Sequence, residues 1–126
     1  MDRNSLDKYI TDTYGATAEF MWEQYPTFAV YRHQNNRKWF AVIMEIPKSK
    51  IGLDDDGLVN VVNLKCDPLL IGSLLYKDGI HRGYHMNKNY WITLRLDSSV
   101  DEDEIKWLLD FSFDLTAPKG KKRRNK

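Results

Sequence analysis

Residues 83–96 decide how this chain folds, and they read Gly83-Tyr84-His85-Met86-Asn87-Lys88-Asn89-Tyr90-Trp91-Ile92-Thr93-Leu94-Arg95-Leu96. The first nine combine an imidazole, two amides, an ammonium, two phenols and an indole, whereas the last five alternate between apolar and polar side chains. Alternation with a period of two indicates a β-strand with one buried face. A loop so rich in polar and aromatic groups more often carries recognition than packing. We therefore expect a strand over residues 90–96, preceded by a loop over residues 79–89 that binds a partner.

Three stretches upstream of this loop predict further strands. Residues 18–22 and 27–32 are rich in apolar and aromatic side chains and are separated by Tyr25-Pro26, which favours a turn. Asn35-Asn36 precedes a third apolar run over residues 37–46. Asparagine tolerates the positive φ that a tight hairpin turn requires. We expect the three strands to form an antiparallel meander.

Helical signals occur at both ends and in the middle of the chain. Apolar residues recur at helical spacing after an N-cap at residues 4–5, and Gly15 can end that helix. Asp67-Pro68 supplies an N-cap and a proline at the first helical position of a second helix. The third helix begins with the capping box Ser99-Val100-Asp101-Glu102 and ends before Pro118. These helices supply apolar faces that can cover a sheet.

The elements together predict an α+β fold. Residues 58–66 add a valine-rich strand, which brings the sheet to five or six mainly antiparallel strands, with helices at the N-terminus, in the middle and at the C-terminus. No internal repeat or linker divides residues 1–117, which we interpret as a single domain. We expect residues 118–126 to form a disordered basic tail.

Charge is distributed unevenly along the chain. The formal net charge is +1, and residues 119–126 hold six basic side chains and no acid, so residues 1–118 carry −5. The six are Lys119, Lys121, Lys122, Arg123, Arg124 and Lys126. Proteins that bind nucleic acid usually have a basic domain or stripe. Such a role here must rest on a local patch or on the tail, which supplies attraction to polyanions without sequence specificity.

Composition also bears on compartment. Cys66 is the single cysteine, so no intramolecular disulfide can form, and a reducing cytosol is the natural compartment. The N-terminus has no basic segment followed by an apolar stretch, and no window is apolar enough to span a bilayer. We expect a cytoplasmic protein with no membrane role, and a monomer is favoured over an oligomer.

The chemical motifs of catalysis and metal binding are incomplete. The acidic run at residues 54–56 precedes a glycine but lacks the other ligands of a calcium loop, so it is read as a turn. His81 and His85 have no third metal ligand close in sequence. Cys66 and His85 could pair as nucleophile and base only if the fold brought them together, and nothing supplies an orienting group. We expect no bound metal or cofactor and no enzymatic activity.

Six motifs follow one another between residues 5 and 117. They are Tyr14-Gly15-Ala16 with Phe20 and Trp22, Tyr25-Pro26, Trp39-Phe40-Ala41, Asn63-Leu64-Lys65-Cys66-Asp67-Pro68, Tyr84-His85-Met86-Asn87-Lys88 with Trp91, and Ser112-Phe113-Asp114-Leu115. In this order they resemble the MmcQ/YjbR family. The resemblance implies a CyaY-like or secretion-chaperone-like α+β fold and a DNA-binding role, with no enzymatic activity. Two positions depart from the family pattern, since Arg82 replaces a proline and Tyr90 replaces a second histidine.

The nucleic-acid hypothesis places the binding surface on the central loop. Arg82 and Lys88 would neutralise phosphates, and Asn87 would hydrogen-bond a phosphate or a base edge. Tyr84 and His85 would stack on unpaired bases. The structural alternative is that the aromatic groups are core anchors and the charges are solvated.

Three more cations are candidates for the same surface. Arg37 and Lys38 flank the Asn35-Asn36 turn and could act as a wing that contacts phosphates. Lys65 lies in an apolar strand, where it either protects a sheet edge or reaches the surface that carries Lys88.

The alternative function is a protein-interaction or small-anion-binding module with no nucleic-acid role. A continuous positive stripe from the Arg37 hairpin to Lys88 would favour DNA, whereas a concave pocket around His85 and Lys88 would favour a small anion. The expected partner is therefore DNA, with a protein partner as the alternative.

Overall fold

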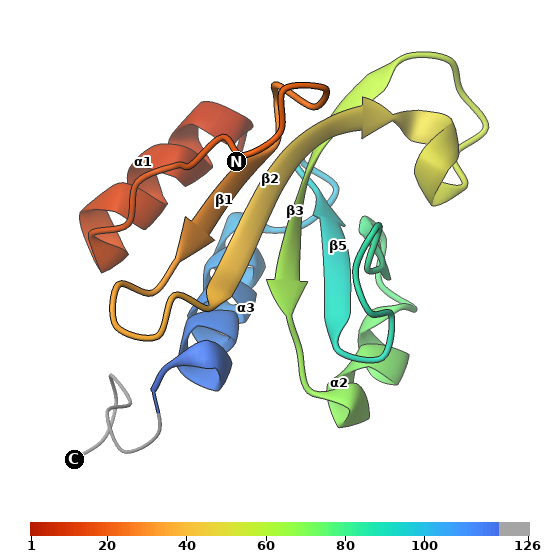
Figure 1. The fold of residues 1–126 in the computed structure, drawn as a ribbon. Helices are drawn as coiled ribbons and strands as arrows, with labels where there is room; N and C mark the ends of the chain where they lie inside the picture. Colours follow the sequence, from red (N-terminus) through yellow and green to blue (C-terminus); the bar gives the residue numbers. More distant parts are fainter. Residues whose placement is uncertain (119–126) are drawn as a thin grey trace.

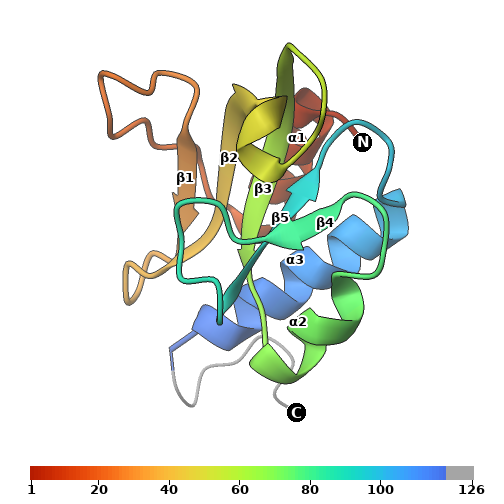
Figure 2. The same ribbon diagram turned by 90° about the vertical axis from the view of Figure 1, so that its right-hand side faces the viewer.

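The computed structural model describes residues 1–118 and has one antiparallel sheet with three α-helices. The α-helices are α1 (Arg3–Tyr14), α2 (Pro68–Leu74) and α3 (Glu102–Thr116), and a short 3-10 helix η1 spans Lys48–Ile51. The strands are β1 (Ala29–Arg32), β2 (Trp39–Pro47), β3 (Leu58–Lys65), β4 (Ile80–Arg82) and β5 (Trp91–Arg95). They lie in the order β1-β2-β3-β5-β4, with every neighbouring pair antiparallel (Figure 1, and Figure 2 for β4). The predicted α+β class is confirmed.

The α-helices all lie on one side of the sheet (Figure 2). Leu6 and Ile10 of α1 and Leu108 of α3 are almost completely buried against this side. The strands supply Phe40, Val62, Leu64, Ile92 and Leu94 to the same core. Burial of these side chains is the main contribution that holds the helices on the sheet.

No α-helix of residues 1–118 covers the opposite side of the sheet, which we call the open face. Because successive residues of a strand point to opposite sides, Val42, Asn63 and Thr93 point to this face. A second apolar cluster lies here, made of Phe28, Val30, Val42, Met44, Ile46, Val59 and Val61. The segment between α1 and β1 and the β4–β5 loop project on this side (Figure 2).

The prediction of a strand at residues 18–22 is wrong. Only Glu19 pairs there, through an isolated bridge with Val30 in which both backbone hydrogen bonds measure 2.9 Å. After Glu19 the chain turns twice, since the backbone N–H of Tyr25 donates to Trp22 and that of Phe28 donates to Tyr25. The aromatic side chains of this segment therefore gather instead of alternating between two faces.

Two of the three helix starts differ from expectation. The Asp67 carboxylate accepts from the backbone N–H of Leu69 at 2.9 Å, as predicted for α2. In α1 the N-cap is Asp2. In α3 the N-cap is Asp101, so the predicted capping box does not form, and Ser99 instead hydrogen-bonds residues 95 and 97.

Two hairpins also differ from the sequence-based expectation. Residues 80–82 form an edge strand, so the central loop contracts to residues 83–90. In the β1–β2 hairpin the positive φ of 63° is at Arg37, not at an asparagine. Asn36 accepts from the backbone N–H of Lys38 at 3.0 Å, which completes the turn.

Candidate functional site

A buried polar network fixes the β4–β5 loop to the open face. Asn63 donates to the Tyr84 carbonyl at 2.7 Å, and the Tyr84 backbone N–H donates to Thr93 Oγ1 at 2.8 Å. Thr93 Oγ1 in turn donates to Asn63 Oδ1. Both side chains on the sheet are fully buried. A paired network in a desolvated site holds one arrangement, because loss of any partner leaves a buried polar group without a hydrogen bond.

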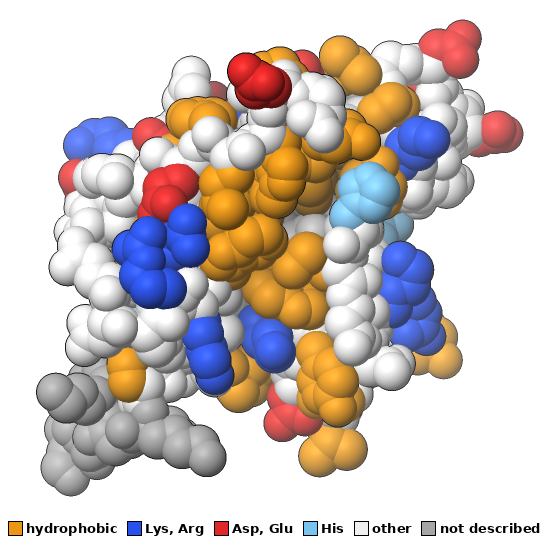
Figure 3. All heavy atoms as spheres, in the orientation of Figure 1, with side chains coloured by type: hydrophobic (Ala, Val, Ile, Leu, Met, Phe, Trp, Pro, Cys, Tyr) orange, Lys and Arg blue, Asp and Glu red, His pale blue; other side chains and the backbone are white. Residues whose placement is uncertain are grey.

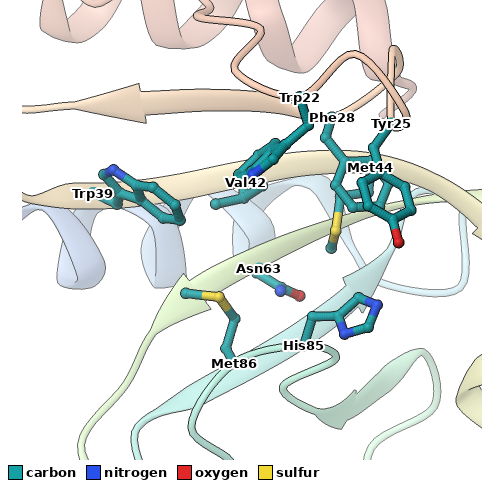
Figure 4. Close-up of a pocket in the computed structure, with 9 residues that line it drawn as sticks. All are labelled: Trp22, Tyr25, Phe28, Trp39, Val42, Met44, Asn63, His85 and Met86. Atoms are coloured by element: carbon teal, nitrogen blue, oxygen red, sulfur yellow. The ribbon is translucent and has the colours of Figure 1, made fainter.

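The residue that follows this anchor has a strained backbone. His85 has a φ of 62°, in the left-handed region that favours glycine. Its ring lies 4.1 Å from that of Tyr84, centroid to centroid. The imidazole is exposed and stands with Met86 over the open face (Figure 4). Strain of this kind persists where the surrounding structure enforces it, often at functional positions.

An apolar hollow of about 320 Å³ lies beneath His85, and we call it the aromatic pocket. The Trp22 and Trp39 rings meet edge to face at 5.8 Å, and the Tyr25 and Phe28 rings stack at 4.8 Å. The pocket is lined by Trp22, Tyr25, Phe28, Trp39, Val42, Met44, Asn63, His85 and Met86 (Figure 4). Its walls come from the segment between α1 and β1, from β2 and from the β4–β5 loop.

A second hollow of about 290 Å³ shares Trp39 as a wall, and we call it the basic pocket. It is lined by Arg37, Lys38, Trp39, Lys65, Trp91, Leu115 and Thr116. The Lys65 ammonium lies 5.6 Å from the ring centroids of both Tyr90 and Trp91, which is within cation–π range. Figure 3 shows the apolar hollow on the open face bordered by Lys and Arg side chains.

A β-bulge turns Trp39 toward the open face. Ala41 pairs with Tyr31, but Arg32 pairs with Trp39, so Phe40 is an extra residue in the register. Phe40 and Ala41 both pack in the helix-covered core, whereas Trp39 packs on the open-face cluster. Without the bulge, strict alternation would put Trp39 on the same side as Ala41.

The cations of this region differ in their partners. Glu19 accepts from Arg32 at 2.7 Å and lies 3.6 Å from Arg37. The hydrogen bond from Arg32 holds the pKa of the Glu19 carboxyl below its usual value. Within residues 1–118, Lys38 and Lys65 have no carboxylate partner. Their charges therefore stay uncompensated beside two indole rings.

The structure distributes the predicted loop residues over different environments. His85 lines the aromatic pocket, whereas Arg82, Tyr84 and Lys88 line a separate hollow with His81. The Lys88 ammonium donates to the Gly83 carbonyl at 2.9 Å. Asn87 accepts from the backbone N–H of Asn89 at 2.9 Å, which makes it part of the turn. The six tail cations lie outside the described residues.

Comparison with known proteins gives the family. The sequence matches YjbR over residues 11–115, most of its length. The chain belongs to the YjbR family. The uncharacterized protein YyaQ of Bacillus subtilis is 38% identical over 116 residues, which cover 92% of this chain and 98% of YyaQ. The resemblance to the MmcQ/YjbR family is confirmed.

Solved structures share the fold of this chain. A crystal structure from Pseudomonas syringae is 43% identical and superposes with a TM-score of 0.91, covering 93% of this YjbR chain and all of its own. An NMR structure from the same organism gives 40% identity and a TM-score of 0.86, with 99% of this chain and all of its own covered. A Deinococcus radiodurans protein at 22% identity and a TM-score of 0.71 shares the fold, with 97% of this chain and 83% of its own covered.

Sequence reasoning did not assign the pocket aromatics of this YjbR protein to a site. The sequence pattern predicts strands and a turn for Trp22, Tyr25 and Phe28, with no binding role. The available signal was the density of aromatic side chains in residues 20–28, which exceeds what one short strand face can pack. Met86 lay within the predicted loop but carried no assigned role.

The remaining reactive groups of the YjbR chain lie apart. Cys66 is buried in the helix-covered core, where burial raises the pKa of its thiol to about 11, whereas His85 stands on the open face. No group of three His, Cys, Asp or Glu side chains within residues 1–118 is placed to hold a metal ion. In the same part of the chain no helix combines the length and apolarity that a membrane crossing requires.

Proposed function

We propose that this protein binds nucleic acid on the open face of its sheet, with backbone phosphates at the basic pocket. The observation that carries the proposal is that Lys38 and Lys65 line one hollow with Trp39 and Trp91, with no carboxylate partner in residues 1–118 to neutralise them. Lysine ammonium groups bind phosphates as point charges, and adjacent indole rings can stack on bases.

The charge of the rest of the body makes this patch distinctive. Residues 1–118 carry −5, so a polyanion is repelled from most of the surface. A short positive region then fixes where the polyanion docks, and the basic tail adds attraction without sequence preference. In this proposal the protein is a non-enzymatic binding protein.

The arrangement is neither a continuous positive stripe from the Arg37 hairpin to Lys88 nor a concave anion pocket around His85 and Lys88. A small-anion site would join His85 to Lys88, but these residues line different hollows. No Lys or Arg side chain of residues 1–118 lines the aromatic pocket itself. Cations beside an apolar, aromatic hollow suit a ligand that has both phosphates and flat rings.

The test is fluorescence anisotropy with labelled single-stranded and double-stranded DNA and RNA at two salt concentrations. The variant Lys38→Gln/Lys65→Gln should bind about tenfold more weakly and should lower the slope of log affinity against log salt by about one to two, because each lysine releases about one counterion. The matched control is Lys8→Gln/Lys77→Gln, which removes two exposed lysines that pair with Asp12 and Glu104 on the helical side.

Equal weakening by the test variant and the control would show that only net charge matters. No detectable binding of any nucleic acid by the unaltered protein would overturn the proposal.

A further inference from the structure

The aromatic pocket and the basic pocket share one lining residue. Trp39 lines both hollows. A ligand that spans them must present a flat apolar group in the aromatic pocket and a negative charge in the basic pocket. A nucleotide of a nucleic-acid strand has this composition, with the base and the phosphate separated by a sugar.

The pocket has the size and lining of a site for one small ring. Its volume of about 320 Å³ is at the lower end of the range typical of small-molecule sites, about 300 to 1,000 Å³. The ring of Trp22 stands at 84° to Trp39 and at 80° to Phe28, so ring faces and edges are both presented to the hollow. Aromatic groups contact one another favourably in stacked and edge-to-face geometries.

Two polar side chains stand at the mouth of this pocket, and the amide of the buried Asn63 also lines it. The phenol of Tyr25 and the imidazole of His85 lie at its rim, whereas Val42 and Met44 form its floor (Figure 4). Both rim residues are exposed, and Tyr25 retains 45% of its accessible surface. A base inserted here would stack on rings within the pocket and hydrogen-bond at its edge, which is how unpaired bases are read.

We infer that the aromatic pocket is a subsite for one unpaired nucleobase of a single-stranded nucleic acid whose phosphate lies at Lys38 and Lys65. The inference rests on the proposed function and names its ligand class. In a duplex the base faces are already stacked on their neighbours, so extracting one has an energetic cost. Single strands should therefore bind more tightly than duplexes.

The charges beside Trp39 favour a base over the apolar side chain of a protein partner. An apolar side chain of a protein partner would fill the hollow, but it would offer no negative charge to Lys38 and Lys65, which have no carboxylate partner within residues 1–118. A polynucleotide uses both features at once.

The experiment measures binding of the full-length protein to three labelled probes. They are a ten-nucleotide thymidine strand, a strand of the same length made of abasic sites, and a hairpin duplex. The unaltered protein should bind the thymidine strand about tenfold more tightly than the abasic strand, as expected for stacking of one base.

The central variant is Tyr25→Ala, which removes an exposed ring and so should fold. It should lose about tenfold in affinity for the thymidine strand, the loss expected from one base stack, and nothing for the abasic strand. The matched control is Tyr76→Ala, which removes a 93% exposed tyrosine beyond α2 and should change neither affinity. Quenching of tryptophan emission by the thymidine strand, but not by the abasic strand, is the second readout.

The outcomes separate the two proposals. If thymidine and abasic strands bind equally while Lys38→Gln/Lys65→Gln still weakens both, the base subsite is overturned and the proposed function stands. If Tyr25→Ala weakens both strands equally, the base subsite is also overturned. If no probe binds, both proposals fail, and an apolar partner surface becomes the better account of the pocket.

Discussion

His85 adopts a left-handed backbone conformation at the mouth of the aromatic pocket, with a φ of 62°. An L-residue in this region has a backbone penalty of about 1–2 kcal/mol relative to glycine. We expect His85→Gly to be more stable than His85→Ala by about 1 kcal/mol, because both remove the ring but only glycine relieves the strain. Urea unfolding of the two variants measures this difference. Equal midpoints would show that the backbone at residue 85 is unstrained.

Burial makes the protonation of His81 unfavourable. Its Nε2 atom is buried without a hydrogen-bond partner within the described residues. Burial, and secondly the charge of Arg95, lower the pKa of the imidazole from its usual 6.5, although Asp97 and Asp78 act in the opposite direction. The folded state therefore binds a proton less readily than the unfolded state, so stability is lost as the pH falls below about 6.5.

The prediction at this residue is that His81→Leu reduces the loss of stability between pH 7 and pH 5. The measurement is the free energy of unfolding at each pH, compared with that of the unaltered protein. The free energy of unfolding should still fall somewhat between pH 7 and pH 5, because burial also lowers the pKa of His33. An unchanged loss of stability would mean that His81 takes up its proton in the folded state without cost.

At the scale of elements, the β4–β5 hairpin depends on a close backbone approach. A Cβ atom at Gly83 would lie 2.8 Å from the Cβ and 2.9 Å from the carbonyl oxygen of Trp91. We expect Gly83→Ala to destabilise the protein by about 1–3 kcal/mol, since the clash involves backbone atoms that cannot move aside. The position of the β4–β5 loop, and with it His85, should shift as well.

The matched control for this hairpin is Gly72→Ala in α2. Nothing lies within 4 Å of a Cβ atom at Gly72, so alanine should stabilise the helix by about 0.5–1 kcal/mol. Thermal unfolding of the two variants compares the same substitution in the two settings. A stabilised Gly83→Ala variant would contradict the packing argument.

At the scale of the whole molecule, an acidic body is joined to a basic tail. Replacing the six cations of residues 119–126 with glutamine should weaken binding to single strands and duplexes by the same factor, because these cations attract any polyanion regardless of its sequence. The proposed preference for single strands should be unchanged, since we assign it to the aromatic pocket. Anisotropy titrations of both probes measure the ratio of the affinity for single strands to the affinity for duplexes. A ratio that falls to one would show that the tail, and not the pocket, is responsible for the preference for single strands.

The sequence by itself determined the fold class and several local structures. Asp67 caps α2, and Gly15 ends α1 with a φ of 70°, because these signals act over a few residues. Alternation identified the strand around Thr93, and an apolar run after Asn35-Asn36 identified the strand around Val42, for the same reason. Residues 79–82 carried too short a pattern to indicate β4, which forms because β5 lies beside it.

The candidate site was decided by tertiary structure. Trp39 reaches the open face because of a bulge at Phe40. No local sequence pattern indicates which residue of a strand will be the extra residue of a bulge. Lys65 lines the same hollow as Lys38 because strand order puts β3 and the β1–β2 hairpin at one end of the sheet. Sequence spacing predicts the interactions between residues that are close to one another in the sequence. Which distant side chains share a pocket depends on strand order, register and the side of the sheet that the helices leave uncovered.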